Sequence, residues 1–306
     1  MVVGAGAIGS FVTARLTEAG WPVAVAARGA SLGSLRAGPL RLVDNAVERE
    51  VRLLVVSDPA EWAPIDLALV CTKSFDTEAA AEALAPALAP GAVVLSLQNG
   101  IENPGILARA CPGASVGGVA VYLGCQRVAP DRVVRRPSRD PVSGRLRDLL
   151  AGGGVGAPGR ALAAVAAAVG VPSRIDQSYD AALWTKLVAN AALNTVTTLG
   201  RARVGEVFAD PRAVDLMLTL GREVVAVARA CGVQVAPDAA EAYVADARHR
   251  LPRDGGSSTL FDLTGGRRLE REALVGAVVR HGDRLGVPVP ASRACDALLR
   301  LLDPGD

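Results

Sequence analysis

The hydrophobic pattern changes kind part-way along the chain. In the first part, short apolar runs predict strands over 2–3, 22–27, 41–43, 50–57, 65–71 and 92–97. Between them, helices are expected over 10–19 and 77–88. Continuous apolar strands separated by helices are typical of a parallel sheet that is covered on both faces. We therefore predict an α/β fold that begins with a Rossmann-like, mostly parallel sheet.

Beyond this part the pattern becomes helical. A helix over 160–169 and a strand over 171–175 close the first domain, and we expect helices over 179–198, 211–231, 236–249, 270–285 and after Pro290. A switch from alternating elements to helices alone indicates a domain boundary. The predicted domains are a dinucleotide-binding domain over 1–176 and an all-helical domain over 177–306.

A basic, glycine-rich stretch over 131–159 precedes that boundary. We expect an irregular hairpin and loop here. Its arginines are Arg132, Arg135, Arg136, Arg139, Arg145 and Arg147.

Composition excludes several function classes. The chain has 306 residues, and 33 basic against 31 acidic side chains give a net charge of +2. This balance provides no electrostatic basis for binding nucleic acid or an anionic membrane. Aromatic residues make up only 3% of the chain, so the cores must be aliphatic. The five cysteines are widely spaced and none has metal-ligand spacing, which favours reduced thiols in a cytoplasm and no metal site.

The amino-terminal residues favour neither a signal peptide nor a membrane span. The apolar start has no basic flank and is soon broken by glycines, and no run is long enough to cross a bilayer. Only three residues precede Gly4, which is short for a central strand. We therefore expect the natural chain to begin a few residues upstream.

Histidine is scarce in this sequence. The two histidines, His249 and His281, have charged, helical surroundings, and we expect both on the surface. Because histidine is the usual proton donor in dehydrogenases, its scarcity directs attention to lysine and to carboxylates.

A dinucleotide-binding signature opens the chain. The residues Gly4-Ala5-Gly6-Ala7-Ile8-Gly9 fit G-x-G-x-x-G, follow a predicted strand and open a predicted helix. Gly4 permits the tight turn, Gly6 lets the backbone approach a pyrophosphate, and Gly9 allows close helix packing. The second strand ends at Arg28, where an acid would favour NAD and an arginine favours the 2′-phosphate of NADP. We therefore expect NADP, although Arg28 alone could be a surface residue.

Three polar side chains form a stripe in the first helix of the second domain. Lys186, Asn190 and Asn194 stand four residues apart, so an α-helix places them on one face, each about 6 Å further along the axis. The stripe is flanked by Leu187, Ala191 and Leu193. Together with the glycine motif, it indicates a cofactor-dependent enzyme whose proton donor is a lysine.

These motifs together resemble the ketopantoate reductase (2-dehydropantoate 2-reductase) family. The resemblance covers nearly the whole chain and includes, in order, the glycine motif, Arg28-Gly29, Cys71-Thr-Lys73-Ser, Gln98-Asn99-Gly100, Leu183-Trp-x-Lys186-x3-Asn190-x3-Asn194, and Ser257-Ser258 twelve residues before Glu270. It implies a Rossmann domain that delivers NADPH to a cleft closed by a helical domain. It also implies reduction of a 2-keto acid to a D-2-hydroxy acid.

The resemblance assigns roles to individual residues. Lys186 resembles the general acid, and Glu270 the carboxylate that orients it. Substrate-binding positions of the family are resembled by Asn190, Asn194 and Ser258. Cofactor-binding positions are resembled by Lys73 and Asn99. Outside the family pattern, Glu270 could belong to a charged turn, Ser258 to a linker or helix cap, and Asn99 to an ordinary Asn-Gly turn.

Two departures leave the substrate open. Positions where family members carry asparagine are Val204 and Val275 here. The leading hypothesis is reduction of 2-dehydropantoate to (R)-pantoate, as in pantothenate biosynthesis. A paralogous reductase of another keto acid and a non-catalytic NADP-binding sensor are the alternatives, and the presence of Lys186 and Glu270 together argues against the sensor. The alanine-rich helices of the second domain fit either a homodimer interface or ordinary core packing.

Overall fold

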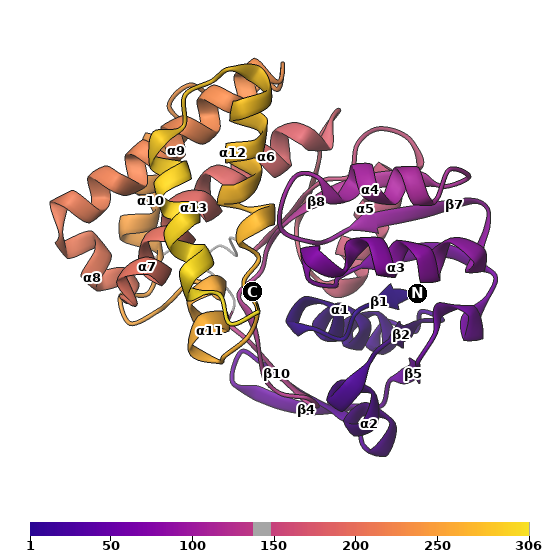
Figure 1. Cartoon of the computed structure of the whole chain (residues 1–306). Coiled ribbons are helices and arrows are strands. Elements are labelled where there is room, and N and C mark those ends of the chain that lie inside the picture. The colour runs from indigo at the N-terminus through magenta and orange to yellow at the C-terminus, as the bar shows by residue number, and fades with distance from the viewer. Residues whose placement is uncertain (137–147, 306) are drawn as a thin grey trace. The chain divides into compact units, whose positions relative to one another are not determined.

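The structure is a computed structural model that describes residues 1–136 and 148–305, and these form two compact units (Figure 1). Unit 1 contains residues 1–98 and 103–182, and unit 2 contains residues 99–102 and 183–306. The domain limit expected at residue 176 stays a prediction. Three arginines of the basic stretch, Arg139, Arg145 and Arg147, lie outside the described residues.

Unit 1 is built around an eight-stranded sheet. Its strands, in spatial order, are β12 (Ser173–Ile175), β11 (Leu149–Gly152), β8 (Ser115–Tyr122), β7 (Leu88–Ser96), β6 (Ile65–Val70), β1 (Val2–Val3), β2 (Ala24–Ala26) and β5 (Leu54–Val56). All neighbouring strands are parallel except β8 and β11, which are antiparallel. The expected mostly parallel sheet is therefore confirmed.

Helices cover both faces of this sheet, which explains the continuous apolar runs. One core contains Val2, Val25 and Leu69 from the strands, together with Phe11 of α1 (Ala7–Glu18) and Val165 of α5 (Ala157–Val169). The other core contains the next residue of each strand, Val3, Ala26 and Val70. It packs on α3 (Thr77–Leu84) and α4 (Asn103–Ala110). Because successive side chains point to opposite faces, the strand positions that face the helices on either side must be apolar.

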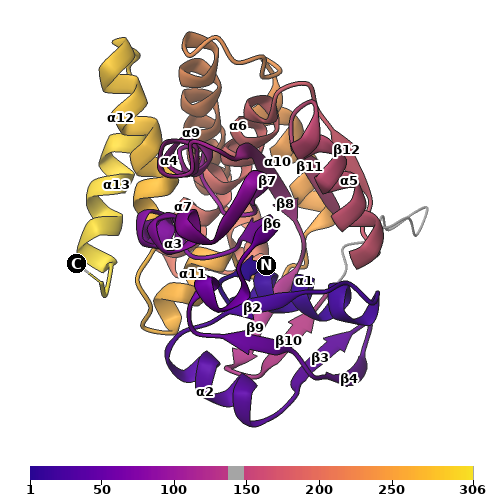
Figure 2. The ribbon, with the colours of Figure 1, turned by 90° about the vertical axis from the view of Figure 1, so that its right-hand side faces the viewer.

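A second sheet of four strands, visible in Figure 2, was only partly expected. Its order is β4 (Val47–Val51), β3 (Leu40–Asp44), β10 (Arg132–Arg135) and β9 (Cys125–Ala129). The single strand predicted over 50–57 was wrong, because β4 ends at Val51 and Leu54 begins β5 of the larger sheet. The irregular hairpin expected over 131–159 was also wrong in part, since β10 and β11 are strands that pair within the two sheets.

Proline explains another boundary that differs from the expected one. The helix predicted over 77–88 ends at Leu84, and a 3₁₀ turn over Ala85–Ala87 contains Pro86. Proline has no backbone N–H and its ring clashes with the preceding turn of an α-helix. Strand β7 begins directly afterwards at Leu88, four residues before the predicted start at 92. The short helix α2 (Gly29–Ala37) was not predicted.

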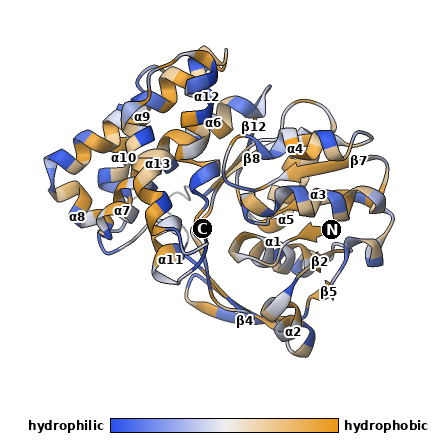
Figure 3. Cartoon of the chain, viewed as in Figure 1, coloured by the Kyte–Doolittle hydropathy of each residue, from blue (hydrophilic) through white to orange (hydrophobic). Residues whose placement is uncertain are grey.

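Unit 2 is helical. Its elements include the second half of α6 (Tyr179–Ala189), α7 (Thr195–Gly200), α8 (Val204–Ala209), α9 (Pro211–Ala230), α10 (Ala239–Arg250), α11 (Ser258–Thr264), α12 (Val275–Leu285) and α13 (Pro290–Leu302). Figure 3 shows hydrophobic and hydrophilic residues interspersed along α12 and α13, as expected for helices with one buried face. In the described part of the chain, no helix has both the length and the apolar character needed to cross a membrane. The Rossmann-like sheet followed by helices confirms the predicted fold class.

Helix α6 does not continue as a regular α-helix. Residues Asn190–Asn194 form a π turn between α6 and α7, whereas the sequence predicted one α-helix over 179–198. A π turn uses i→i+5 hydrogen bonds and is frequently found at functional sites. The expectation of uniform α geometry was therefore wrong over these five residues.

Candidate functional site

The glycine loop after β1 shows a separate structural reason for each glycine. Gly4 has φ +104°, and a Cβ there would lie 2.9 Å from the backbone nitrogen of Thr72. A Cβ on Gly9 would lie 1.9 Å from the carbonyl oxygen of Gly4. These two positions exclude side chains because the start of α1 packs tightly against the strand ends.

Gly6 differs from the other two glycines. A Cβ there would lie 3.7 Å from the carbonyl oxygen of Cys71, an ordinary contact, and its φ of −76° suits any residue. Packing within the chain therefore does not require glycine at this position. In the dinucleotide fold the second glycine allows close approach of the pyrophosphate, and Gly6 fits that role.

The amino terminus of α1 is suited to an anion. Gly6 is its N-cap and supplies no side-chain cap, and the first turn carries no acidic residue. The backbone N–H groups at a helix start lack partners within the helix, and the helix dipole favours negative charge there. Ala7, Ile8 and Gly9 form this first turn. The loop therefore fits the pyrophosphate of a dinucleotide.

The carboxyl ends of β2 and β6 hold two predicted cofactor residues. Arg28 is the N-cap of α2, directly after β2, and its side chain is exposed. Lys73 follows β6 and is half-buried. Buried Gln98, beyond the end of β7, donates from Nε2 to Thr72 Oγ1 at 3.1 Å and to Thr77 Oγ1 at 2.8 Å. This network fixes the chain around Lys73, and Gln98 had not been assigned a role from the sequence.

In unit 2, three predicted residues from distant parts of the sequence meet. Lys186 Nζ donates to Asn99 Oδ1 at 2.8 Å, and Asn99 Nδ2 donates to Glu270 Oε2 at 3.4 Å. Lys186 comes from α6, and Asn99 from the short segment 99–102. Glu270 is only 7% exposed, so this is no solvated charged turn.

The surroundings of Lys186 change its acidity. Burial disfavours the charged ammonium and lowers the pKa of Lys186 from 10.5 to about 8, while the negative charge of Glu270 acts in the opposite direction. A lysine with this pKa is mostly protonated at neutral pH and gives up its proton far more readily than an ordinary lysine. It has the properties of a general acid.

The π turn affects the direction of the two asparagines. Four residues of an α-helix exceed a full turn by about 40°, so a regular stripe drifts sideways along the helix. A π turn holds more residues per turn, so the four residues from Asn190 to Asn194 fall short of a full turn and offset that drift. Asn194 is buried and donates from Nδ2 to Thr259 Oγ1 at 3.3 Å, whereas Asn190 is half-buried.

The three residues Ser257, Ser258 and Thr259 have different environments. Ser257 is buried, caps α11 by accepting from the N–H of Leu260 at 3.1 Å, and accepts from Thr197 Oγ1 at 2.8 Å. Thr259 is the neighbour of Asn194. Ser258, the predicted substrate residue, is exposed between them. The cap reading that the sequence left open thus applies to Ser257, while Ser258 remains directed to solvent.

Comparison with known proteins places this arrangement in a family. The family model described as "Ketopantoate reductase PanE/ApbA" matches residues 1–146, and that described as "Ketopantoate reductase PanE/ApbA C terminal" matches residues 178–303. The chain belongs to the ketopantoate reductase family. It is thus an oxidoreductase, as the sequence predicted.

Relatives of this ketopantoate reductase family member align over nearly their whole length. The 2-dehydropantoate 2-reductase of Halobacterium salinarum is 34% identical over 98% of this chain and 97% of its own. That of Archaeoglobus fulgidus is 31% identical over 99% and 97%. The crystal structure of a PanE/ApbA family ketopantoate reductase from Ralstonia eutropha JMP134 has a TM-score of 0.87 and 36% identity, covering 99% and 98%.

A second polar cluster near Lys186 had not been expected in this family member. Glu102, three residues after Asn99, lies 2.5 Å from Arg280 Nη2 and 3.2 Å from His281 Nε2. His281 also packs edge-on against Trp184, with ring centroids 5.6 Å apart. Its side chain is only 15% exposed, so the surface position predicted for it was wrong, whereas His249 is exposed.

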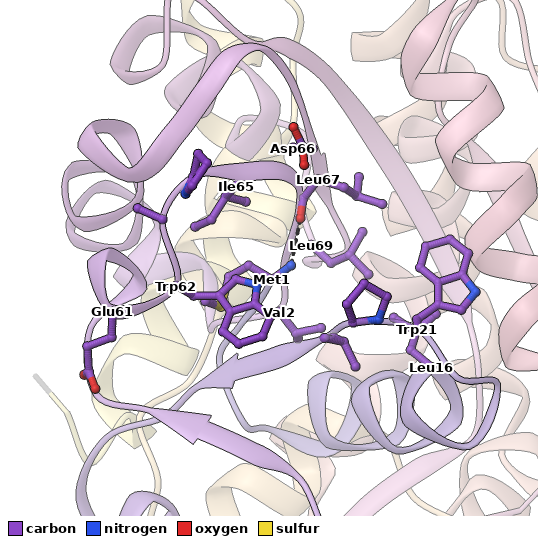
Figure 4. A pocket seen from close by; sticks show the side chains of 14 residues that line it. Met1, Val2, Leu16, Trp21, Glu61, Trp62, Ile65, Asp66, Leu67 and Leu69 are labelled. Atoms are coloured by element: carbon purple, nitrogen blue, oxygen red, sulfur yellow. Dashed lines mark hydrogen bonds between the residues drawn. The ribbon is translucent and has the colours of Figure 1, made fainter.

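A hollow in unit 1 lies away from the glycine loop and from Lys73. It has a volume of about 530 Å³ and is lined by Met1, Trp21, Trp62, Ile65 and Leu67 among others (Figure 4). These residues surround the amino ends of β1 and β6, whereas Gly4 and Lys73 follow the carboxyl ends of the same strands. Ligands of open α/β sheets bind at the carboxyl ends.

Among the described residues, no group of His, Cys, Asp or Glu is arranged to hold a metal ion.

Proposed function

We propose that this protein reduces 2-dehydropantoate to (R)-pantoate with NADPH. The observation that carries the proposal is the Lys186–Asn99–Glu270 cluster in a member of the ketopantoate reductase family. The name of the relatives from Halobacterium salinarum and Archaeoglobus fulgidus, 2-dehydropantoate 2-reductase, supports this substrate.

NADPH fits the residues that unit 1 offers. The first turn of α1 would hold the pyrophosphate, with Gly6 leaving room for it. Arg28 follows β2, and no acidic residue occurs between it and Asp44, which favours the 2′-phosphate over the free ribose of NADH. Lys73 and Asn99 are proposed to lie by the nicotinamide end. When bound, the dihydronicotinamide supplies a hydride to the keto carbon.

The protein's own contribution is the proton. As hydride arrives, negative charge develops on the carbonyl oxygen of the substrate. The ammonium of Lys186 stabilises that charge and then donates the proton from Nζ, which leaves a neutral amine. Asn99 accepts from Nζ and keeps the lysine side chain in one direction. Glu270 keeps the ammonium form populated because its charge raises the pKa that burial lowers.

Neutral groups are proposed to bind the rest of the substrate. Asn190, Asn194 and Ser258 offer amide and hydroxyl donors to the substrate carboxylate without adding net charge to the site. The hydrogen bond to Thr259 fixes the side-chain amide of Asn194, which lies between α6 and α7, relative to α11. A bound carboxylate would therefore meet donors that are already oriented.

A different keto acid remains the second candidate for the substrate. The sequence argument for it was that valine stands at 204 and 275 where family members carry asparagine. The structure weakens this argument, because Val204 and Val275 are 3% and 0% exposed and belong to hydrophobic cores. Neither valine side chain is accessible to a ligand. A homodimer, one of the two interpretations of the alanine-rich helices, remains a prediction.

The test replaces Lys186, which is one of only two lysines among the 33 basic residues; the other is Lys73. Lys186→Gln is expected to lower kcat/KM for 2-dehydropantoate by about 10²–10⁴-fold, while the Kd for NADPH stays within about threefold. Lys186→Arg retains the charge, but arginine does not release protons in proteins, and so it should not restore turnover. Unchanged turnover in Lys186→Gln would remove the lysine from the mechanism. Faster reduction of another keto acid by the wild type would replace the substrate.

A further inference from the structure

One arginine of the second sheet contacts the glycine loop. Arg127, on β9, donates from Nη1 to the carbonyl oxygen of Ala5 at 3.4 Å. The same nitrogen donates to Ser31 Oγ in the first turns of α2. Arg127 thus joins the loop after β1 to the helix after β2, although it lies about a hundred residues further along the sequence.

The described residues at the start of α2, which Arg127 contacts, include a further basic side chain. Arg28 caps the amino end of α2, and Ser31 follows three residues later. Neither α1 nor α2 carries an acidic residue in its first turn. Two guanidinium groups and a hydroxyl therefore gather around the end of β2, where the dinucleotide fold places the adenosine ribose.

The hydroxyl of Ser31 is held so that it can donate its hydrogen to an anion. Its side chain belongs to a residue only 7% exposed, and its oxygen accepts from Arg127. A hydroxyl has one donor hydrogen and two acceptor positions. While the oxygen accepts from the guanidinium, its hydrogen can be donated to an anion. A phosphate group at this point would meet both a cation and a neutral donor.

We propose that Arg127 and Ser31 bind the 2′-phosphate of NADPH together with Arg28, and that Arg127 is a determinant of cofactor specificity. This inference rests on the proposed function, since it names further residues for the same cofactor. Guanidinium groups suit phosphate because their planar donors match its oxygens, and such charge-assisted hydrogen bonds are stronger than neutral ones. Arg127 would therefore bind a charged group of NADPH, the 2′-phosphate, which NADH lacks.

The experiment compares the Kd of NADPH and NADH, measured by nicotinamide fluorescence, in the wild type and in Arg127→Gln. NADPH binding should weaken by about 10- to 100-fold, as expected for loss of a charged hydrogen bond, and NADH binding by less than about threefold. The difference should shrink at high salt. Arg132→Gln is the matched control, because it removes one arginine from the adjacent strand β10 and should alter neither Kd.

Other outcomes overturn the proposal. An equal loss for both cofactors would place Arg127 at the pyrophosphate or in loop packing alone, and unchanged NADPH binding would exclude a contact. If Arg127→Gln fails to fold, Arg127→Lys gives the same comparison with a smaller NADPH-selective loss. The proposed function fails separately if the wild type itself binds NADH more tightly than NADPH.

Discussion

Asn99 lies between Lys186 and Glu270, with its oxygen 2.8 Å from the ammonium and its amide nitrogen 3.4 Å from the carboxylate. One side chain thus accepts from the cation and donates to the anion. The amide dipole is aligned with both charges, so it stabilises the ionised forms of the two groups together. The ionisation of Lys186 should consequently respond to changes at either neighbour.

The first prediction concerns the pH dependence of turnover. The protonated form of Lys186 is the acid, so kcat/KM for keto acid reduction should fall as the pH rises through the pKa of about 8. Glu270→Gln removes the charge that raises this pKa, and the fall should begin at lower pH. Asn99→Asp adds a negative charge at the same distance, and the fall should begin at higher pH.

Nuclear magnetic resonance gives an independent reading of this prediction. Because the sequence contains only Lys73 and Lys186, ¹³C-labelled lysine should give two sets of side-chain signals. The set from Lys186 should titrate near pH 8 and disappear in Lys186→Gln. A titration near the ordinary value of 10.5, or shifts of the same sign in both neighbouring variants, would contradict the account of this site.

The second prediction separates ligand binding from packing in the glycine loop. A methyl group on Gly6 finds room in the protein, so Gly6→Ala should leave the melting temperature nearly unchanged but weaken NADPH binding by about tenfold or more. A methyl group on Gly9 would overlap the carbonyl oxygen of Gly4. Gly9→Ala should therefore cost about 1–3 kcal/mol or more in stability.

Calorimetry of the two alanine variants, with and without NADPH, makes the comparison. Gly33→Ala is a control, because a Cβ there meets nothing within 4 Å and the residue lies inside α2. It should leave binding intact and slightly raise the melting temperature. Normal NADPH affinity in Gly6→Ala would mean that the loop does not approach the pyrophosphate closely.

How far the fold could be predicted depended on whether its signals were local. The mostly apolar runs of β6 and β7 indicated a covered parallel sheet, since burial on both faces favours apolar residues at successive positions. The second sheet carried a weaker signal. Val47–Val51 is mostly exposed, and β3 pairs with β10 from a distant part of the chain. Such pairing depends on tertiary structure rather than on local sequence.

The site shows the same division. Spacing alone related Lys186 to Asn190 and Asn194, and a family resemblance was needed to connect them with Glu270. The bridging position of Asn99 between Lys186 and Glu270 had no signal in the sequence, because the contacts join residues 87 and 171 positions apart. The π turn over Asn190–Asn194 likewise had no signal in the residue pattern.

The third prediction concerns how the segment bearing Asn99 is held in place. Arg284 Nη2 lies 2.8 Å from His281 Nδ1, which leaves Nε2 to donate to Glu102. Burial and nearby arginines lower the pKa of His281, so the ring is neutral at neutral pH. Glu102→Ala should release the segment from His281 and Arg280, and thereby loosen the hydrogen bond between Asn99 and Lys186.

The expected result is a kcat about five- to tenfold lower, with the alkaline fall of the pH profile moved to lower pH because the ammonium loses its acceptor. Glu241→Gln is the control, since it breaks a comparable surface ion pair with Arg222 in the same unit. A lower melting temperature with an unchanged pH profile would show that Glu102 is merely structural and does not position Asn99.

The last prediction concerns the junction of the two sheets of unit 1. Arg135 is 6% exposed and pairs with Asp44 at 3.2 Å and with fully buried Asp148 at 2.8 Å, while its guanidinium lies 5.0 Å from the ring centre of Phe11. Asp148→Ala leaves a buried cation with one partner fewer and should cost about 3–5 kcal/mol in urea unfolding. The exposed pair of Arg132 and Glu48 should contribute little, so Arg132→Gln is expected to unfold at nearly the wild-type midpoint. Similar midpoints for both variants would mean that the buried pair is already solvated. Arg135 would then have no stabilising role at this junction.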